Sequence, residues 1–221
     1  MIVRTPYTVN LDLIKDALLS IHTFDSKTSL NNPVGDFFYD PWTIKQEFIG
    51  TPWQSILDSL PMPVGEARII VLKPGTSYYC HADADDRWHL NLQSEQGYLI
   101  DLDSSTMHRL HTDGIWYTMD AGCKHTAANF GQIDRVQLVI RRLLNRNNLV
   151  NPVDVKIVLK SNAFDFRYQF DNTISPWLNR ANKQGNINNF KFVDSEVSFS
   201  IEQHSIESLK QVLPDIFEII Q

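Results

Sequence analysis

The region that decides the fold is residues 67–145, which read ARIIVLKPGTSYYCHADADDRWHLNLQSEQGYLIDLDSSTMHRLHTDGIWYTMDAGCKHTAANFGQIDRVQLVIRRLLN. Short apolar or alternating runs follow one another here, separated by turn signals that contain Gly, Pro or Asp. Many short strands with closely spaced turns are typical of a sandwich or a barrel. No long helical pattern interrupts the series, which argues against a doubly wound parallel sheet. We therefore expect about eight strands in two antiparallel sheets, as in a jelly roll.

The flanks of this region have different patterns. Residues 8–22 place apolar side chains at helical spacing, and Thr51-Pro52 is a suitable start for a second short helix. Beyond residue 150 the pattern predicts a small α+β unit, with a strand at 153–160, a helix at 173–183, a hairpin at 189–202 and a helix at 205–220 that Pro214 interrupts. The predicted protein is mainly β, with a core domain at 1–150 that includes N-terminal helices, and a small unit at 151–221.

Composition excludes some classes of function. The chain has 221 residues and a formal net charge of -6, which argues against sequence-independent binding to nucleic acid. No apolar run approaches the roughly 20 residues that span a bilayer, and the N-terminus lacks a signal-peptide pattern. The two cysteines, Cys80 and Cys123, are too few for a disulfide scaffold. We expect both cysteines to be small buried hydrophobic residues and not catalytic thiols. We also expect a reducing compartment and a cytoplasmic protein.

One constellation of histidines and a carboxylate indicates a metal site. His81 and Asp83 lie at positions i and i+2 of a predicted strand, so both side chains are expected on one face. His125 follows on another predicted strand. Two imidazoles and one carboxylate on one side of a metal leave further coordination positions open, as in non-heme iron(II) oxygenases. The alternative for each histidine is a hydrogen-bonded core or rim residue, and ligand roles are not expected for His22, His108, His111 and His204.

Two further features strengthen the prediction. Arg135 starts the last strand of the β region, where a guanidinium could grip the free carboxylate of a co-substrate through two parallel hydrogen bonds. In residues 87–92, RWHLNL, alternation places Arg87, His89 and Asn91 on one face of a strand. This polar face either lines a polar cleft or meets solvent, and Arg135 could equally be a solvated charge at a strand end.

The sequence resembles the aspartyl/asparaginyl β-hydroxylase family of iron(II)- and 2-oxoglutarate-dependent oxygenases over roughly residues 66–145. The resemblance rests on Leu72-Lys73-Pro74-Gly75-Thr76 before His81, on the Arg87-x-His89-Leu90 motif, on Asp120 and on the spacing from His125 to Arg135. It implies a double-stranded β-helix, a jelly-roll-like and cupin-like fold. By the same resemblance, His81, Asp83 and His125 hold the iron, Arg135 grips the far carboxylate of 2-oxoglutarate, and Arg87 and His89 face co-substrate and substrate.

The reaction that the resemblance implies is hydroxylation with O2, which releases succinate and CO2. Its substrate would be a small molecule such as an amino acid, or a peptide or protein side chain, and some relatives act on lipid chains. One departure is Ile70, because some relatives have a hydroxyl residue there that helps to hold 2-oxoglutarate. Aromatic residues that could form a substrate wall, or simply belong to the core, are Phe37, Phe38, Tyr39, Trp42 and Trp116.

Two rival functions stay open. One is a non-catalytic cupin-like module that binds a metal or ligand, although cupins usually have two histidines as HxH followed by Glu, whereas this chain has His81-Ala82-Asp83. The other is a zinc hydrolase with three protein ligands and a water. Arg135 has no necessary role in such a hydrolase, so the residue pattern favours the oxygenase.

Overall fold

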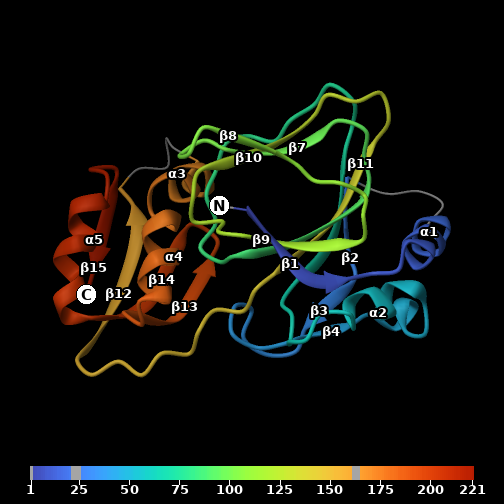
Figure 1. Ribbon diagram of the computed structural model, residues 1–221. Coiled ribbons are helices and arrows are strands. Elements are labelled where there is room, and N and C mark those ends of the chain that lie inside the picture. Colours follow the sequence, from blue (N-terminus) through green and yellow to red (C-terminus); the bar gives the residue numbers. More distant parts are fainter. Residues whose placement is uncertain (1, 21–25, 161–164) are drawn as a thin grey trace. The chain divides into compact units, whose positions relative to one another are not determined.

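The computed structural model describes residues 2–20, 26–160 and 165–221 (Figure 1). The chain forms two compact units. The first unit comprises the residues up to Tyr79 together with Asp86–Asp120 and His125–Leu143, and the second comprises Cys80–Asp85, Ala121–Lys124 and Leu144–Gln221. Two short segments from the middle of the chain thus cluster with the C-terminal residues, and the division at residue 150 stays a prediction.

The larger sheet of the first unit has six strands, and all of its neighbouring strands are antiparallel. Its strands come from the N-terminus as well as from the central region, which gives the unit its mainly β character. In spatial order they are β1 (Ile2–Thr8), β9 (Ile115–Met119), β6 (Arg87–Gln93), β11 (Arg135–Arg141), β5 (Ala67–Leu72) and β2 (Lys27–Ser29).

A second, three-stranded antiparallel sheet consists of β10 (His125–Asn129), β7 (Gly97–Asp101) and β8 (Thr106–Arg109). The segment after β5 runs along the free edge of β10, where Tyr78 N–H donates to Ala127 C=O at 2.9 Å and Ser77 forms a bridge with Ala128. The two sheets pack together through a small apolar cluster in which Leu72 and Met119 of the larger sheet meet Leu99 and Ala127 of the smaller one.

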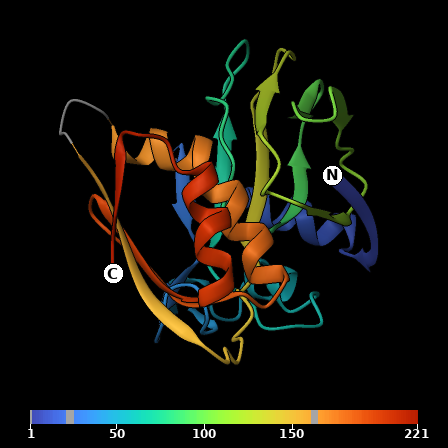
Figure 2. The same ribbon diagram turned by 90° about the vertical axis from the view of Figure 1, so that its left-hand side faces the viewer.

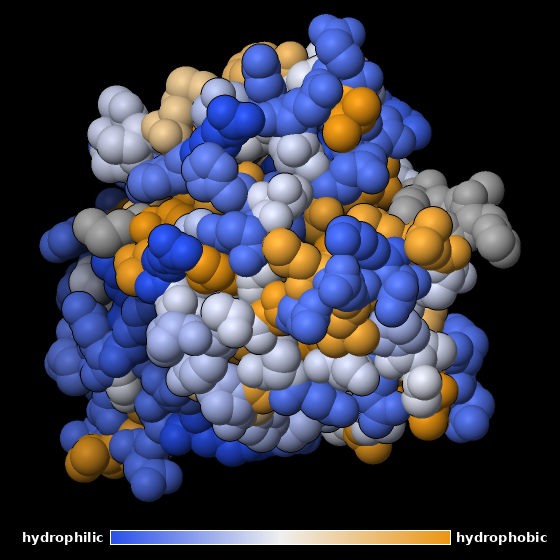
Figure 3. Space-filling view, turned by 45° about the vertical axis from the view of Figure 1, so that its right-hand side comes forward, coloured by the Kyte–Doolittle hydropathy of each residue, from blue (hydrophilic) through white to orange (hydrophobic). Residues whose placement is uncertain are grey.

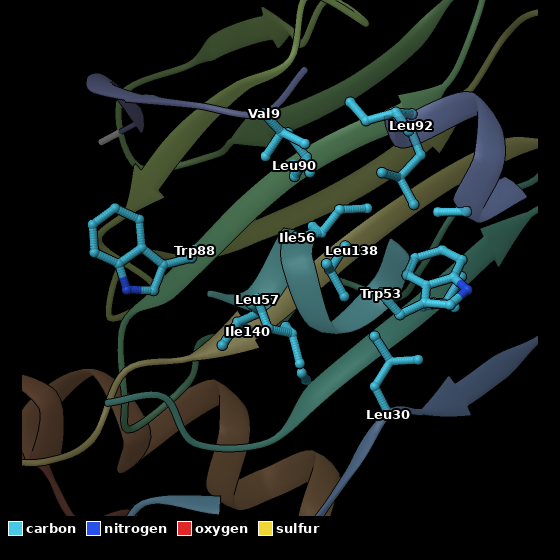
Figure 4. Packing of buried hydrophobic residues seen from close by; sticks show 14 of the residues in the cluster. Val9, Leu30, Trp53, Ile56, Leu57, Trp88, Leu90, Leu92, Leu138 and Ile140 are labelled. Carbon is cyan, nitrogen blue, oxygen red and sulfur yellow. The ribbon is translucent and has the colours of Figure 1, made fainter. Parts of the chain in front are cut away.

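The main hydrophobic core lies on the opposite face of the larger sheet. There α1 (Leu11–Leu19) and α2 (Pro52–Leu57) cover β6 and β11 with residues such as Trp53 and Ile56 (Figure 4). Asn10 caps α1 by accepting a hydrogen bond from Asp12 N–H at 2.7 Å, and Pro52 occupies the first turn of α2. Both predicted N-terminal helices are therefore confirmed within the described residues.

Some elements of the first unit differ from the sequence-based expectation. Strands β1 and β2 were not anticipated, because each pairs with a strand far away in the chain; Ile2, for example, lies opposite Met119. Residues 31–44 contribute a separate two-stranded ribbon. The remaining elements of this unit are β3 (Asn31–Pro33), β4 (Trp42–Ile44) and a short 3-10 turn at Gln46–Phe48.

The second unit has its own four-stranded antiparallel sheet with helices on one face (Figure 2). The strand order is β13-β14-β12-β15, and aromatic rings such as Phe166, Phe170 and Trp177 join the helices to the sheet. Its elements are β12 (Pro152–Leu159), α3 (Phe166–Thr173), α4 (Ser175–Lys183), β13 (Ile187–Val193), β14 (Glu196–Glu202), a 3-10 turn at Gln203–Ser205, α5 (Ile206–Val212) and β15 (Phe217–Ile220).

The α+β pattern predicted beyond residue 150 is confirmed in most of its parts, but one expectation is wrong. Residues 205–220 do not form one interrupted helix: α5 ends at Val212, and the chain beyond Pro214 pairs with β12, so that Ile220 lies opposite Lys156. The helix α3 was missed, although Asp165 caps it and Phe166, Phe170 and Ile174 recur at helical spacing.

Apolar residues on the surface are scattered. On the face drawn in Figure 3, hydrophobic residues are broken up by hydrophilic ones. A mixture of this kind is ordinary for a folded protein, so this face by itself indicates no docking site.

Candidate metal centre

The segment that carries His81 and Asp83 is not a strand, which corrects the expectation that both project from a pleated face. Around His81 the backbone makes only isolated bridges. Instead of joining a ladder, Ala82 N–H donates to Asp171 C=O at 2.9 Å and Asp83 N–H donates to Ala121 C=O at 2.7 Å. This irregular segment still brings the two side chains together, with His81 Nε2 3.9 Å from Asp83 Oδ2.

His81, Asp83 and His125 form a group that could hold a metal ion. One ligand atom from each residue lies within 4.8 Å of the ligand atoms of the other two. Asp83 and His125 are buried, and His81 is partly exposed. Two imidazoles and one carboxylate are a donor set suited to iron or zinc, and the three residues leave part of a metal's coordination sphere free.

No other such group of His, Cys, Asp and Glu side chains occurs among the described residues. His108 of β8 lies 3.0 Å from the Thr106 hydroxyl, an ordinary surface contact. That His108, His111 and His204 are not ligands stays a prediction, and His22 lies outside the residues that the structure describes. Neither Cys80 nor Cys123 forms a disulfide, and both are only partly buried, so neither is the fully buried hydrophobe that we expected.

The alternation of residues 87–92 is confirmed. Trp88, Leu90 and Leu92 point into the hydrophobic core that α2 covers, as Figure 4 shows. The polar residues of β6 therefore lie on the other face, which we call the inner face because it looks toward the three-stranded sheet. The prediction left a solvent-exposed face open, and burial rules it out: Arg87, His89 and Asn91 are between 1% and 5% exposed.

Arg135 lies on the inner face and is 2% exposed, so it is not a solvated charge at a strand end. Its Nη2 donates to Gln137 Oε1 at 2.7 Å, and no ion pair joins it to an acidic residue in the described part of the chain. Burial lowers the pKa of Arg135 to about 10, and the nearby Tyr78 opposes this shift. The guanidinium is therefore a buried cation at neutral pH, which is costly without an anionic partner.

Buried polar atoms without partners gather around this cation. Among the described residues, Arg135 Nε, Gln137 Nε2, Asn91 Oδ1 and both ring nitrogens of His89 lack a hydrogen bond of normal geometry. The four side chains come from the adjacent strands β6 and β11, where Asn91 lies opposite Gln137. Buried polar atoms nearly always find partners in a folded protein, so these atoms are candidates to bind a polar ligand or ordered water on the inner face.

His89 is held in its neutral form. Burial lowers the pKa of His89 to about 3, and the charges of Arg135, His125 and Arg87 act in the same direction, while Gln137 opposes them. A neutral imidazole offers one donor and one acceptor, and it adds no positive charge to a face that already holds Arg87 and Arg135.

The loop aromatics divide into two groups. Trp116 belongs to the hydrophobic core, where its Nε1 donates to Ser59 Oγ at 2.9 Å, so it cannot form a substrate wall. Phe37 and Phe38 instead contact Arg141, whose guanidinium carbon lies 4.9 Å and 5.5 Å from their ring centres. Because Arg141 is on β11 in phase with Arg135, these two rings reach the end of the inner face.

Sequence reasoning missed Gln137 and Gly97, both of which contact Arg135. Gln137 follows Arg135 by two positions on a strand, so their shared face was a signal that could have been used. Gly97 gave no such signal, because its closeness to Arg135 depends on how β7 packs across from β11.

Comparisons with known proteins add little. No protein-family model matches the chain, and no curated protein matches it either. Among solved structures, the chain is similar to a cupin domain from Bordetella pertussis Tohama I, with a TM-score of 0.31 and 20% identity over 34% of this chain and 78% of that domain. A likeness this partial carries no argument about fold or function. In the described residues, no helix has the length and apolar character needed to cross a membrane.

Proposed function

We propose that the chain is an iron(II)- and 2-oxoglutarate-dependent oxygenase that hydroxylates an amino acid or a peptide or protein side chain. The observation that carries the proposal is Arg135, a buried cation without an acidic partner in the described residues, on the same inner face as His89 and close enough to it to lower its pKa. An anionic co-substrate would supply the missing partner.

In the proposed site, His81, Asp83 and His125 would hold the metal. The donor set fits iron(II), and it leaves positions for a co-substrate and for O2. When bound, the iron and its co-substrate supply the oxygen chemistry, and the protein supplies binding and orientation. The burial of Asp83 and His125 limits the access of water to two of the three ligands.

The far carboxylate of 2-oxoglutarate would lie against Arg135, whose fork suits a carboxylate. Gln137 supports this assignment, because its Oε1 orients Arg135 and its buried Nε2 still needs an acceptor. Position 70 has no hydroxyl group, but Ile70 lies opposite Gln137 in the sheet. We therefore assign to Gln137 the second contact that a hydroxyl residue makes in some relatives.

The order of the strands supports the proposed double-stranded β-helix. Strands β5 and β6 lie in the six-stranded sheet, and the segment between them forms a bridge with the three-stranded sheet at Ser77 and Ala128. Strands β7 and β8 then lie in the three-stranded sheet, β9 in the six-stranded sheet, β10 in the three-stranded sheet and β11 in the six-stranded sheet. Two antiparallel sheets that exchange strands in this way characterise jelly rolls and cupins. Arg87 and the rings of Phe37 and Phe38 are the proposed contacts for the substrate.

The experiment that tests the function is succinate release by the purified protein with iron(II), ascorbate and 2-oxoglutarate. Release that requires all three components supports the oxygenase, and addition of amino acids and peptides would then identify substrates by stimulation. Tight metal binding without any turnover would favour a non-catalytic cupin-like module. Turnover of an ester or amide with zinc, independent of 2-oxoglutarate, would favour the hydrolase.

A further inference from the structure

The second unit holds the segment that carries two of the proposed metal ligands. Cys80–Asp85 and Ala121–Lys124 cluster with the C-terminal residues of the chain. The two backbone hydrogen bonds of this segment, from Ala82 to Asp171 and from Asp83 to Ala121, fall within this unit. The conformation of the segment between His81 and Asp83 therefore depends on the second unit.

One anchor is the last turn of α3. Carbonyl groups in the last turn of a helix lack partners within that helix, and the Asp171 carbonyl finds one in Ala82 N–H. The Asp171 side chain is 1% exposed, and its Oδ2 accepts a hydrogen bond from Arg167 Nε at 2.6 Å. This ion pair joins the buried carboxylate to a guanidinium on a half-exposed side chain, and it fixes the helix end that supplies the carbonyl.

A second anchor is α4, which lies directly against the turn at 121–124. A Cβ added to Gly122 would lie 2.7 Å from Asn179 Oδ1 and 2.9 Å from Asn179 Cβ, so no larger residue fits without movement. The same turn supplies the Ala121 carbonyl that binds Asp83 N–H, and it leads directly into His125. Asn179 thus packs against a turn that is hydrogen-bonded to Asp83 and precedes His125 in the chain.

Both helices are themselves fixed to the sheet of the second unit. Phe170 of α3 packs on Phe190 and Phe192 of β13, and Trp177 of α4 packs on Phe199 of β14. Asn179 is 2% exposed and Ala82 is fully buried. Close packing of this kind transmits displacements instead of absorbing them.

We propose that α3 and α4 position the metal site, with Asp171 and Asn179 as positioning residues for the His81–Asp83 segment and for the turn before His125. The inference rests on the proposed metal site and gives the C-terminal unit a role in it. Groups that hold metal ligands in place typically change metal affinity by roughly 10- to 100-fold when they are removed.

The test is metal binding by the full chain, measured with iron(II) and cobalt(II) against a competing chelator. Gly122→Ala forces the turn away from Asn179, and Asp171→Ala removes the buried partner of Arg167. Each variant should bind metal roughly 10- to 100-fold more weakly, with an altered cobalt absorption spectrum. Adding Asn179→Ala to Gly122→Ala removes the two closest atoms, Oδ1 at 2.7 Å and Cγ at 2.8 Å, and leaves Cβ at 2.9 Å, so the double variant should recover part of the lost affinity.

Ile157→Val is the matched control, since Ile157 is fully buried in β12 and the substitution makes the same unit less stable while Asp171, Asn179 and Gly122 stay unchanged. Its melting temperature should fall while its metal affinity stays at the wild-type value. If Ile157→Val weakens metal binding as much as Gly122→Ala, or if both anchor variants bind like the wild type, the positioning inference fails while the proposed function stands. Wild-type protein that binds no metal would overturn both.

Discussion

Arg135 crosses directly over Gly97. A Cβ added at position 97 would lie 2.4 Å from Arg135 Cδ and 2.8 Å from its Nε. The contact joins the start of β11 in one sheet to the start of β7 in the other, so the guanidinium lies between the two sheets of the first unit. Glycine at 97 is needed here because of space and not because of backbone conformation.

The first prediction follows from this contact. Gly97→Ala should displace Arg135 and raise the apparent dissociation constant for 2-oxoglutarate by about tenfold, equivalent to about 1.4 kcal/mol. Metal affinity should stay close to wild type, because the substitution contacts none of the proposed ligands. Isothermal titration of 2-oxoglutarate into the metal-loaded protein measures the first quantity, and chelator competition measures the second.

A double variant provides the control for this prediction. If Gly97 acts through Arg135, then Gly97→Ala should cause no further loss of affinity for 2-oxoglutarate in protein that already carries Arg135→Ala. Additive losses in the double variant would mean that Gly97 serves the fold or the ligand independently of the arginine.

The second prediction concerns Arg135 itself. Arg135→Lys keeps a positive charge but loses the fork and the donor to Gln137, so 2-oxoglutarate should bind roughly ten- to a hundredfold more weakly, for a loss of roughly 1.5–3 kcal/mol. Arg135→Ala should weaken 2-oxoglutarate binding more than Arg135→Lys does, while both variants largely retain iron binding. If succinate release by Arg135→Ala depends on 2-oxoglutarate as in the wild type, another residue is the anchor or 2-oxoglutarate is not the co-substrate.

Local pattern was enough to predict some of these features. The alternation of Trp88 and Leu90 with Arg87 and His89 assigns the faces of β6, because the period of a strand is independent of its partners. The same reasoning failed for His81–Asp83, whose peptide N–H groups bind Asp171 and Ala121 carbonyls far away in the chain. The three proposed ligands do lie together, even though the element predicted to carry two of them was wrong.

Features that depend on distant partners were beyond the sequence. Strand β1 forms because Ile2 pairs with Met119, and β15 forms because Ile220 pairs with Lys156. Nothing near either strand specifies its partner. The burial of Arg135 is of the same kind, because it requires that β7 lies across from β11 with glycine at the point of contact.

The third prediction separates ligands from other histidines. His81→Ala and His125→Ala should each abolish stoichiometric iron binding and all succinate release, because two remaining ligands hold a metal much more weakly than three. His108→Ala is the matched control, since His108 lies on β8, outside the proposed metal group, with its Nε2 3.0 Å from the Thr106 hydroxyl. It should bind iron and turn over like the wild type. Retained iron in His125→Ala together with lost iron in His108→Ala would refute the assigned centre.

The fourth prediction concerns the stability of the metal-free protein in acid, where His89 is the relevant group. Its pKa is about 3 in the folded protein, against a usual value of 6.5. Between these two pH values the imidazole is protonated in the unfolded chain and neutral in the folded chain. Stability from the neutral His89 is thus fully present above pH 6.5 and is lost as the pH falls toward 3. The slope that one such group contributes is at most about 1.4 kcal/mol per pH unit.

His89→Gln tests this prediction, because it keeps a polar side chain of similar length but cannot titrate. The melting temperature of each protein, measured with EDTA from pH 7.5 down to pH 4, should fall more steeply for the wild type than for the variant. The difference should begin near pH 6.5, where the unfolded histidine starts to take up its proton. Parallel curves would mean that His89 is protonated in the folded protein, and hence that the inner face tolerates a third positive charge beside Arg87 and Arg135.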